Sequence, residues 1–226
     1  MSLDLYGEIE PYLGFEEQKE RLYSIFLSKI LKSGAKSVLD IGCGSGEMVI
    51  KLKNSSIEAV GIDLSKEMVR RAKERGAKAQ VLDICSVADR YEAAIAVFDV
   101  LNYIDPASLK NFLCCVDNVL KQGGIFICDI NTLYGFEEVA QGSLIIDRED
   151  RFVSLDAVFE EGRLETKIDL FTKRGDMYER SGSKIVQYYH DIDSLKSCPG
   201  LRLKEVDFVS LFGELSDKAI LTFEKV

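Results

Sequence analysis

Proline is scarce in this sequence, and biased tracts are absent. The chain of 226 residues has only 3 Pro, with 46% hydrophobic and 30% charged residues. Disordered chains are instead depleted in hydrophobic residues and rich in proline or in charge of one sign. The composition therefore indicates an ordered protein, and the length fits one large domain or one domain with an embedded subdomain.

Positive charge is also scarce. The 29 Lys and Arg residues stand against 38 Asp and Glu residues, which gives a net charge of -9. Proteins that bind the phosphate backbone need a cationic stripe to displace counterions. The densest basic cluster is diluted by Glu67 and Glu74, and it consists of Lys66, Arg70, Arg71, Lys73, Arg75 and Lys78. Attraction to nucleic acid or to an anionic membrane is therefore not expected.

Long apolar runs and paired cysteine motifs are missing as well. No run approaches the roughly 20 residues of a membrane span, and residues 1–10 carry acids instead of the apolar core of a signal peptide. We therefore expect a cytoplasmic protein. The cysteines lack the C-x-x-C spacing of zinc sites, so we expect no metal centre and reduced core thiols. They are Cys43, Cys85, Cys114, Cys115, Cys128 and Cys198.

The first part of the chain alternates predicted strands and helices. An amphipathic helix is predicted over residues 16–32, because its apolar residues recur at helical spacing. Apolar runs then predict strands at residues 36–41, 57–62, 77–82, 91–98 and 125–130. Helices are predicted between them, at about residues 47–53, 65–75 and 106–120, the last ended by Gly123 and Gly124. This alternation indicates a doubly wound α/β fold with a parallel sheet.

The period changes after residue 141. Apolar and polar residues alternate over residues 153–189, which predicts antiparallel strands with one wet face. Hairpin turns are predicted at Glu161-Gly162 and Gly175-Asp176. We expect a three-stranded sheet over residues 142–190, inserted as a cover beside the main sheet. A short helix near residues 193–197 and two strands at about 201–211 and 215–224 complete the chain.

The most informative segment is a glycine loop at residues 40–46, DIGCGSG, between a predicted strand and a predicted helix. Glycines there let a ligand lie against the main chain at the carboxyl edge of the sheet. In a dinucleotide loop the third glycine would come one position later, where Glu47 stands. Asp40 and Glu47 would repel a pyrophosphate, whereas they suit a ligand that carries a cationic amine.

Several motifs now resemble those of the class I S-adenosylmethionine-dependent methyltransferases. The strongest part of the resemblance covers residues 36–132. Its motifs are VLDIGCGSGEM at 38–48, GIDLSKEMVRRAKERG at 61–76, LDI at 82–84, FDVLNYI at 98–104 and LKQGGIFICDINT at 120–132. The resemblance implies a Rossmann-like, seven-stranded, mainly parallel sheet with an antiparallel last strand. Residues 1–141 and 191–226 would form the cofactor-binding core, with residues 142–190 as the substrate cover.

The resemblance also implies which residues hold the cofactor. Asp40 would face the methionine amino group, Asp63 would accept both ribose hydroxyls, and Phe98 would close the methionine side. Asp83 and the Ile84 N–H would meet the adenine edge. Two simpler interpretations stay open, namely that Asp63 belongs to a helix N-cap and that Asp83 is a solvated strand end. The full set of cofactor-binding candidates is Tyr12, Asp40, Gly42, Cys43, Gly44, Asp63, Leu64, Met68, Asp83, Ile84 and Phe98.

No catalytic residue follows from the resemblance. The sulfonium methyl group is already electrophilic, so the protein mainly holds donor and acceptor in line. His190, Tyr103 and Tyr134 are the candidates on the expected substrate side, with Asn102, Asn131, Tyr6 and Tyr12 nearby. His190 has a reference pKa of about 6.5 and can accept a proton at neutral pH, although a surface or sheet-end histidine is the simpler interpretation.

The acceptor is expected to be a small molecule. The segment after the fourth strand, FDVLNY, lacks the Asn/Asp-Pro-Pro-Tyr/Phe signature of enzymes that methylate nucleobase or glutamine nitrogens. The inserted sheet resembles the cover of small-molecule methyltransferases. Nitrogen and oxygen acceptors both stay open, and so does a homodimer. The alternatives are a non-catalytic S-adenosylmethionine-binding regulatory module and a nicotinamide-dependent oxidoreductase.

Overall fold

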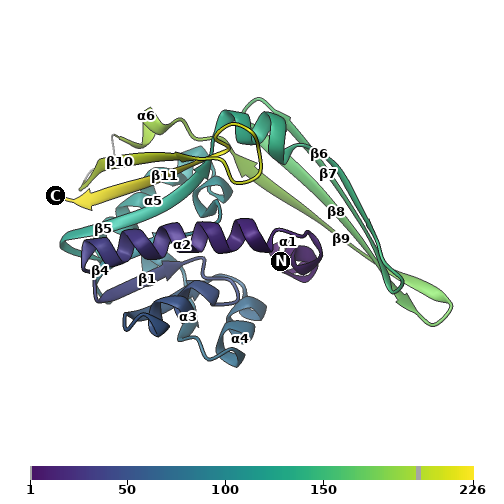
Figure 1. Ribbon diagram of the computed structural model, residues 1–226, viewed down its shortest axis with the longest axis horizontal. Coiled ribbons are helices and arrows are strands. Elements are labelled where there is room, and N and C mark those ends of the chain that lie inside the picture. Colours follow the sequence, from purple (N-terminus) through teal and green to yellow (C-terminus); the bar gives the residue numbers. More distant parts are fainter. Residues whose placement is uncertain (1, 197–199) are drawn as a thin grey trace.

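The computed structural model describes residues 2–196 and 200–226 (Figure 1). A seven-stranded sheet with the order β10-β11-β5-β4-β1-β2-β3 forms the centre of the core. Only β11 runs antiparallel to its neighbours β5 and β10. This arrangement confirms the predicted Rossmann-like sheet. The strands are β1 (Ser37–Ile41), β2 (Glu58–Asp63), β3 (Ala79–Val81), β4 (Tyr91–Ala96), β5 (Leu120–Asn131), β10 (Leu201–Val209) and β11 (Lys218–Lys225).

Helices pack on both faces of this sheet and bury its apolar strands. One face carries α2, α3 and α4, with Phe26 and Leu52 fully buried, and the other face carries α5, with Val116 fully buried. Burial on both faces explains why the sequences of the central strands are continuous apolar runs. The helices are α1 (Ser2–Ile9), α2 (Glu16–Ser33), α3 (Glu47–Asn54), α4 (Lys66–Glu74), α5 (Pro106–Val119) and α6 (Ile192–Leu195).

A second, antiparallel sheet with the order β6-β7-β8-β9 projects from the core (Figure 1). The turns at Glu161-Gly162 and Gly175-Asp176 lie where they were predicted. The sheet has four strands instead of the expected three, because residues 142–147 pair along their length with β7. Leu144, Ile145 and Ile146 are consecutive, so they lack the period-2 signature of a strand. The strands are β6 (Gly142–Asp147), β7 (Arg151–Glu160), β8 (Arg163–Arg174) and β9 (Met177–Tyr188).

Two predictions about the core were wrong. Gly123 and Gly124 do not end α5, which stops at Val119; they lie inside β5, beside an irregularity in its pairing with β4. The cysteines are not all reduced, because Cys85 and Cys115 form a disulfide. Cys43, Cys114 and Cys128 are free thiols, and Cys198 lies outside the described residues.

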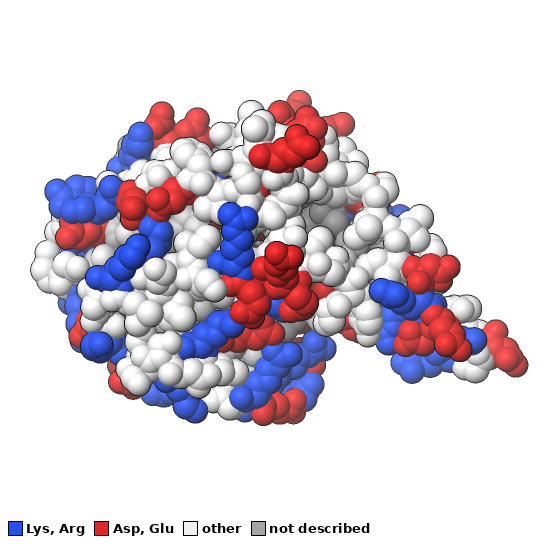
Figure 2. All heavy atoms as spheres, in the orientation of Figure 1, with Lys and Arg blue, Asp and Glu red and all other residues white. Residues whose placement is uncertain are grey.

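Charges are mixed on the face shown in Figure 2, where basic and acidic side chains are interspersed. In the basic cluster, Arg70 and Arg71 pair with Glu67, and Arg75 pairs with Glu47. These ion pairs offset part of the positive charge of the basic cluster. Within the described ranges, none of the helices has both the length and the apolar character needed to cross a membrane.

Candidate active site

The glycine loop lies between the end of β1 and the start of α3. Its backbone turns through left-handed conformations, with φ of 72° at Gly42, 51° at Gly44 and 79° at Gly46. A Cβ at Gly46 would lie 2.9 Å from the Ala72 Cβ of α4, so this glycine lets α3 and α4 pack closely. A Cβ at Gly44 would meet nothing within 4 Å. The main chain at Gly44 is therefore open to a ligand.

Asp63 joins this loop to the next helix. Its Oδ2 accepts a hydrogen bond from the Gly44 N–H at 2.9 Å, and its Oδ1 accepts one from the Ser65 N–H at 2.8 Å. The α4 N-cap is Ser65, as predicted, because its hydroxyl accepts from the Met68 N–H. An ionised carboxylate has about four acceptor positions. Two positions on Asp63 are thus available to ligand hydroxyls beside the open backbone of Gly44.

Acidic side chains lie close together near the end of β1. The Asp40 side chain is only 2% exposed, and burial together with the Asp63 carboxylate raises its pKa to about 8. Tyr23 lies nearby, and burial together with Glu47 and Asp40 raises its pKa far above the usual value. Burial likewise raises the pKa of the Cys43 thiol, so this thiol stays protonated. A cationic ligand would relieve the repulsion between the carboxylates.

The loop after β3 presents Asp83 and Ile84. Asp83 is exposed, and its Oδ1 accepts from the Cys85 N–H at 2.8 Å, which caps the short helix η2 (Ile84–Ser86). Because Ile84 is the first residue of η2, its N–H has no acceptor within that helix. The loop therefore offers one free carboxylate oxygen and one N–H donor, the set that an adenine edge requires. The disulfide at Cys85 ties this loop to α5.

The N-terminal helix α1, which the sequence patterns did not predict, covers this edge of the sheet. The Asp4 carboxylate accepts from the Ser65 hydroxyl at 2.5 Å, and Arg71 donates to the Gly7 carbonyl at 3.2 Å. A Cβ at Gly7 would lie only 1.7 Å from the Met68 Cε, so α1 rests directly on Met68. On its other side α1 packs against the four-stranded sheet, with Ile9 fully buried.

The cofactor candidates Leu64 and Tyr12 have different surroundings. Leu64 is 58% exposed at the end of β2. Tyr12 lies in η1 (Glu10–Tyr12), where the Arg151 guanidinium of β7 stacks over its ring at 4.4 Å from the centroid. The structure thus brings Asp40, Gly44 and Asp63 together, and it places Tyr12 at the junction with the second sheet.

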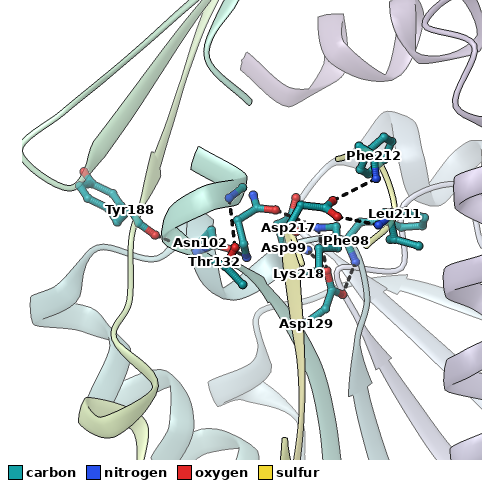
Figure 3. A network of polar contacts seen from close by, with 12 residues as sticks. Phe98, Asp99, Asn102, Asp129, Thr132, Tyr188, Leu211, Phe212, Asp217 and Lys218 are labelled. Carbon is teal, nitrogen blue, oxygen red and sulfur yellow. Dashed lines mark hydrogen bonds and ion pairs between the residues drawn. The ribbon is translucent and has the colours of Figure 1, made fainter. Parts of the chain in front are cut away.

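The turn after β4 has an unusual backbone. Phe98 and Asp99 both adopt left-handed conformations, with φ of 64° and 62°. Such a conformation costs an L-residue with a side chain roughly 1–2 kcal/mol. The Asp129 carboxylate holds the turn by accepting from the Phe98 N–H at 2.8 Å and from the Asp99 N–H at 3.2 Å (Figure 3). The Phe98 ring lies edge-on to Tyr23 at 5.2 Å.

A buried lysine from the last strand completes this network. Lys218 is 2% exposed and pairs with Asp99, with Asp129 at 3.1 Å and with the Asn131 Oδ1 at 3.1 Å. These three acceptors match the three N–H donors of an ammonium group, and the two carboxylates raise the pKa of Lys218 despite its burial. Burial raises the pKa of Asp129, although Lys218 opposes the shift.

The candidate catalytic side chains have structural contacts in this arrangement. The His190 Nε2 lies 2.9 Å from the Leu101 carbonyl and 3.0 Å from the Ile104 carbonyl, so it donates to them. Burial lowers the pKa of His190, which keeps the ring neutral at pH 7. Tyr103 packs beneath α1, and burial raises its pKa. Tyr134 lies against Gly213. A catalytic role for any of them stays a prediction.

Asn102 connects the turn to both sheets. Its amide donates to the Tyr188 carbonyl at 2.8 Å, and its carbonyl oxygen accepts from the Asn131 N–H at 3.0 Å. With the His190 contacts, these bonds fix the end of β9 to η3 (Val100–Tyr103). The reasoning from sequence missed Asp129 and Lys218. A charged residue inside the apolar segment IFICDI was the available signal for Asp129, whereas Lys218 gave none.

The sheet order and the glycine loop at its carboxyl edge define an α/β protein of the Rossmann-like class. A family described as "Methyltransferase domain" matches residues 38–124. The putative methyltransferase YqeM of Bacillus subtilis is 26% identical over 186 residues, which cover 75% of this chain and 74% of that protein.

Two solved structures share the fold over nearly the whole chain. An S-adenosylmethionine-dependent methyltransferase from Clostridium acetobutylicum has a TM-score of 0.81 and 19% identity, and covers 99% of this chain and 97% of its own. CalS10 is an amino pentose methyltransferase from Micromonospora echinaspora with bound S-adenosylmethionine. It has a TM-score of 0.74 and 15% identity, and the match covers 98% of this chain and 97% of CalS10.

A methyltransferase domain thus matches residues 38–124, and the fold of the whole chain is shared with S-adenosylmethionine-dependent methyltransferases. S-adenosylmethionine, which is bound in CalS10, is the cofactor that the resemblance in the sequence implies. The residues present suit that molecule. Gly44 leaves its backbone open, Asp63 keeps acceptor positions beside it, and the buried Asp40 carboxylate favours a cationic group.

Proposed function

We propose that this enzyme transfers a methyl group to a small-molecule acceptor with a nitrogen or oxygen nucleophile, by in-line displacement. Residues 1–141 and 191–226 would form the cofactor-binding core, and residues 142–190 the substrate cover. The observation that carries the proposal is the Asp63 carboxylate, which fixes both Gly44 and Ser65 while keeping two acceptor positions. The relation to CalS10, whose substrate is an amino pentose, supports a small acceptor.

The chain's own residues would mainly bind and orient. The bound cofactor supplies the electrophilic methyl group, and the protein supplies alignment, which can lower such a barrier by roughly 7–11 kcal/mol. Asp63 would accept the ribose hydroxyls, Asp83 and the Ile84 N–H would meet the adenine edge, and Asp40 would face the methionine amino group. Gly42, Cys43 and Gly44 would border the methionine part, and Leu64 and Met68 would pack on the base.

The four-stranded sheet and α1 would exclude water from the reacting groups. They pack together through Ile9 and Tyr103, at the side of the core where the acceptor would enter. A cytoplasmic location is part of the proposal. The Cys85–Cys115 disulfide counts against it, because such bonds are rare in reducing compartments. Sedimentation of the purified protein would show whether the enzyme is a homodimer.

Calorimetric titration of the wild type, Asp63→Ala and Asp63→Asn with S-adenosylmethionine and with NADH tests the assignment of the site. We expect the wild type to bind S-adenosylmethionine. Asp63→Ala should weaken this binding roughly 10- to 100-fold, because hydrogen bonds to a charged group are lost. Asp89→Ala, in an exposed loop before β4, is the matched control and should bind normally.

The outcomes separate the alternatives. Binding of NADH without binding of S-adenosylmethionine would overturn the proposal in favour of an oxidoreductase. Binding of S-adenosylmethionine with no S-adenosylhomocysteine produced from a panel of amine and hydroxyl acceptors would favour the regulatory module. Circular dichroism of each variant checks that a loss of binding is not a loss of folding.

A further inference from the structure

The Phe98–Asp99 turn lies on one particular side of the glycine loop. In the sheet order, β4 neighbours β1 on the side away from β2 and Asp63. A Cβ at Gly42 would lie 2.8 Å from the Val100 Cγ2, so the turn contacts the loop directly. The ribose and base candidates lie over β2 and β3, which leaves the β4 side for the amino-acid half of the cofactor.

This turn does not hold its shape by local sequence preference. Neither Phe98 nor Asp99 is a glycine, yet both have positive φ. Their two N–H groups are satisfied by one carboxylate, Asp129, which is fully buried in the neighbouring strand β5. Strained backbone of this kind persists only where the surroundings fix it, and it is concentrated at functional sites.

Lys218 places one positive charge beside two carboxylates at the turn (Figure 3). It contacts the carboxylates of Asp99 and Asp129 and comes from β11, far along the chain from both. The Asp99 side chain is 19% exposed and pairs with Lys218, so without Lys218 its carboxylate would lose this cationic partner. A methionine carboxylate bound on this side would be repelled by an unpaired Asp99.

We propose that Asp129 and Lys218 are positioning residues that set the affinity for the methionine half of the cofactor. They act through the Phe98–Asp99 turn, Asp129 by fixing its backbone and Lys218 by neutralising Asp99. This inference rests on the proposed function, because it takes the site beside Gly44 to hold S-adenosylmethionine.

The test compares two nucleosides that differ in the amino-acid half. S-adenosylhomocysteine carries that half, and 5′-methylthioadenosine lacks it. Calorimetry on Asp129→Asn and Lys218→Met should show S-adenosylhomocysteine binding weakened about 10-fold or more, with 5′-methylthioadenosine binding within about twofold of the wild type. Lys225→Met is the matched control, because Lys225 also lies on β11 but pairs with Asp117 instead. It should leave both affinities unchanged.

A further variant tests the inference if Asp129→Asn and Lys218→Met do not fold. Phe98→Ala removes a half-buried side chain of the turn and should give the same selective loss. In the Phe98→Ala background, Asp129→Asn should then cause little further loss, because both act on one element.

The outcomes are distinguishable. Equal weakening of both nucleosides, or lowered thermal stability with both affinities intact, would mean that the network is only structural, and would overturn the inference. An unselective effect of Phe98→Ala would also overturn it. If the wild type binds neither nucleoside, the proposed function fails first, and this inference fails with it.

Discussion

At the scale of single residues, the site is defined by carboxylates in different surroundings. Asp63 is partly exposed and shares its oxygens with two backbone N–H groups. Asp40 is buried, and its pKa is raised to about 8, mainly by desolvation. Burial therefore favours the neutral form of the Asp40 carboxyl. Asp40 is poised to ionise when a cation arrives.

Asp40→Asn tests this state through the pH dependence of stability. The folded pKa of Asp40 is above its unfolded value, so the folded state binds the extra proton, and stability falls as pH rises from about 4 to about 8. The asparagine does not titrate. The free energy of unfolding of Asp40→Asn relative to the wild type should therefore rise by at least about 1 kcal/mol between pH 5 and pH 8.

Urea denaturation at several pH values measures this difference. The same variant should bind S-adenosylmethionine more weakly, because the carboxylate that faces the cation is gone. A pH-independent difference between the two proteins would show that Asp40 is already ionised in the folded state.

At the scale of elements, the proposed cofactor site is formed by short turns, and contacts with other elements fix the position of these turns. The disulfide from Cys85 to Cys115 closes a separation of 30 residues and ties η2 to α5. Constraining a loop of this length in the unfolded chain stabilises a fold by roughly 3–4 kcal/mol in the chain-entropy model. The bond follows directly after Asp83 and Ile84, so it also restrains the residues proposed to meet adenine.

Reduction should therefore destabilise the protein. We expect a dithiol reductant to lower the free energy of unfolding by about 3 kcal/mol, measured by urea denaturation. The Cys85→Ser/Cys115→Ser double variant should match the reduced wild type and should not respond to the reductant. A wild type whose unfolding is the same with and without reductant would contradict this expectation.

At the scale of the whole molecule, the site depends on both ends of the chain. Residues 2–9 cover the cofactor edge, and β11 brings Lys218 beside Asp99 and Asp129. The second sheet is fixed to the same place by His190 and Asn102. The turn after β4 is thus the point where the core, the cover and the last strand meet.

Lys218→Met should be strongly destabilising for this reason. It leaves the buried Asp129 and the partly buried Asp99 without their cation, and breaking a buried pair typically costs about 3–5 kcal/mol. The loss should be smaller at pH 5 than at pH 8, because protonation of Asp129 relieves the repulsion. Lys225→Met, at a more exposed pair, should cost about 1 kcal/mol or less. Equal losses in the two variants, measured by urea denaturation, would contradict the role of the network.

Much of the fold followed from local patterns. The glycine loop, the Ser65 cap and the two hairpin turns are determined by residues within a few positions of one another, and each lies where it was predicted. The helix α1 was missed because a segment of eight residues is helical only through tertiary contacts. The strand β6 was missed because its side chains do not alternate.

The sequence by itself determined the doubly wound sheet, the acidic glycine loop and the acid at the end of β2, because periodicity and backbone freedom are local properties. Only the tertiary structure decided which cysteines pair, that α1 covers Met68, and that Lys218 lies between Asp99 and Asp129. These contacts join residues far apart in the chain. They arise from strand order and packing, which leave no periodic trace in the sequence.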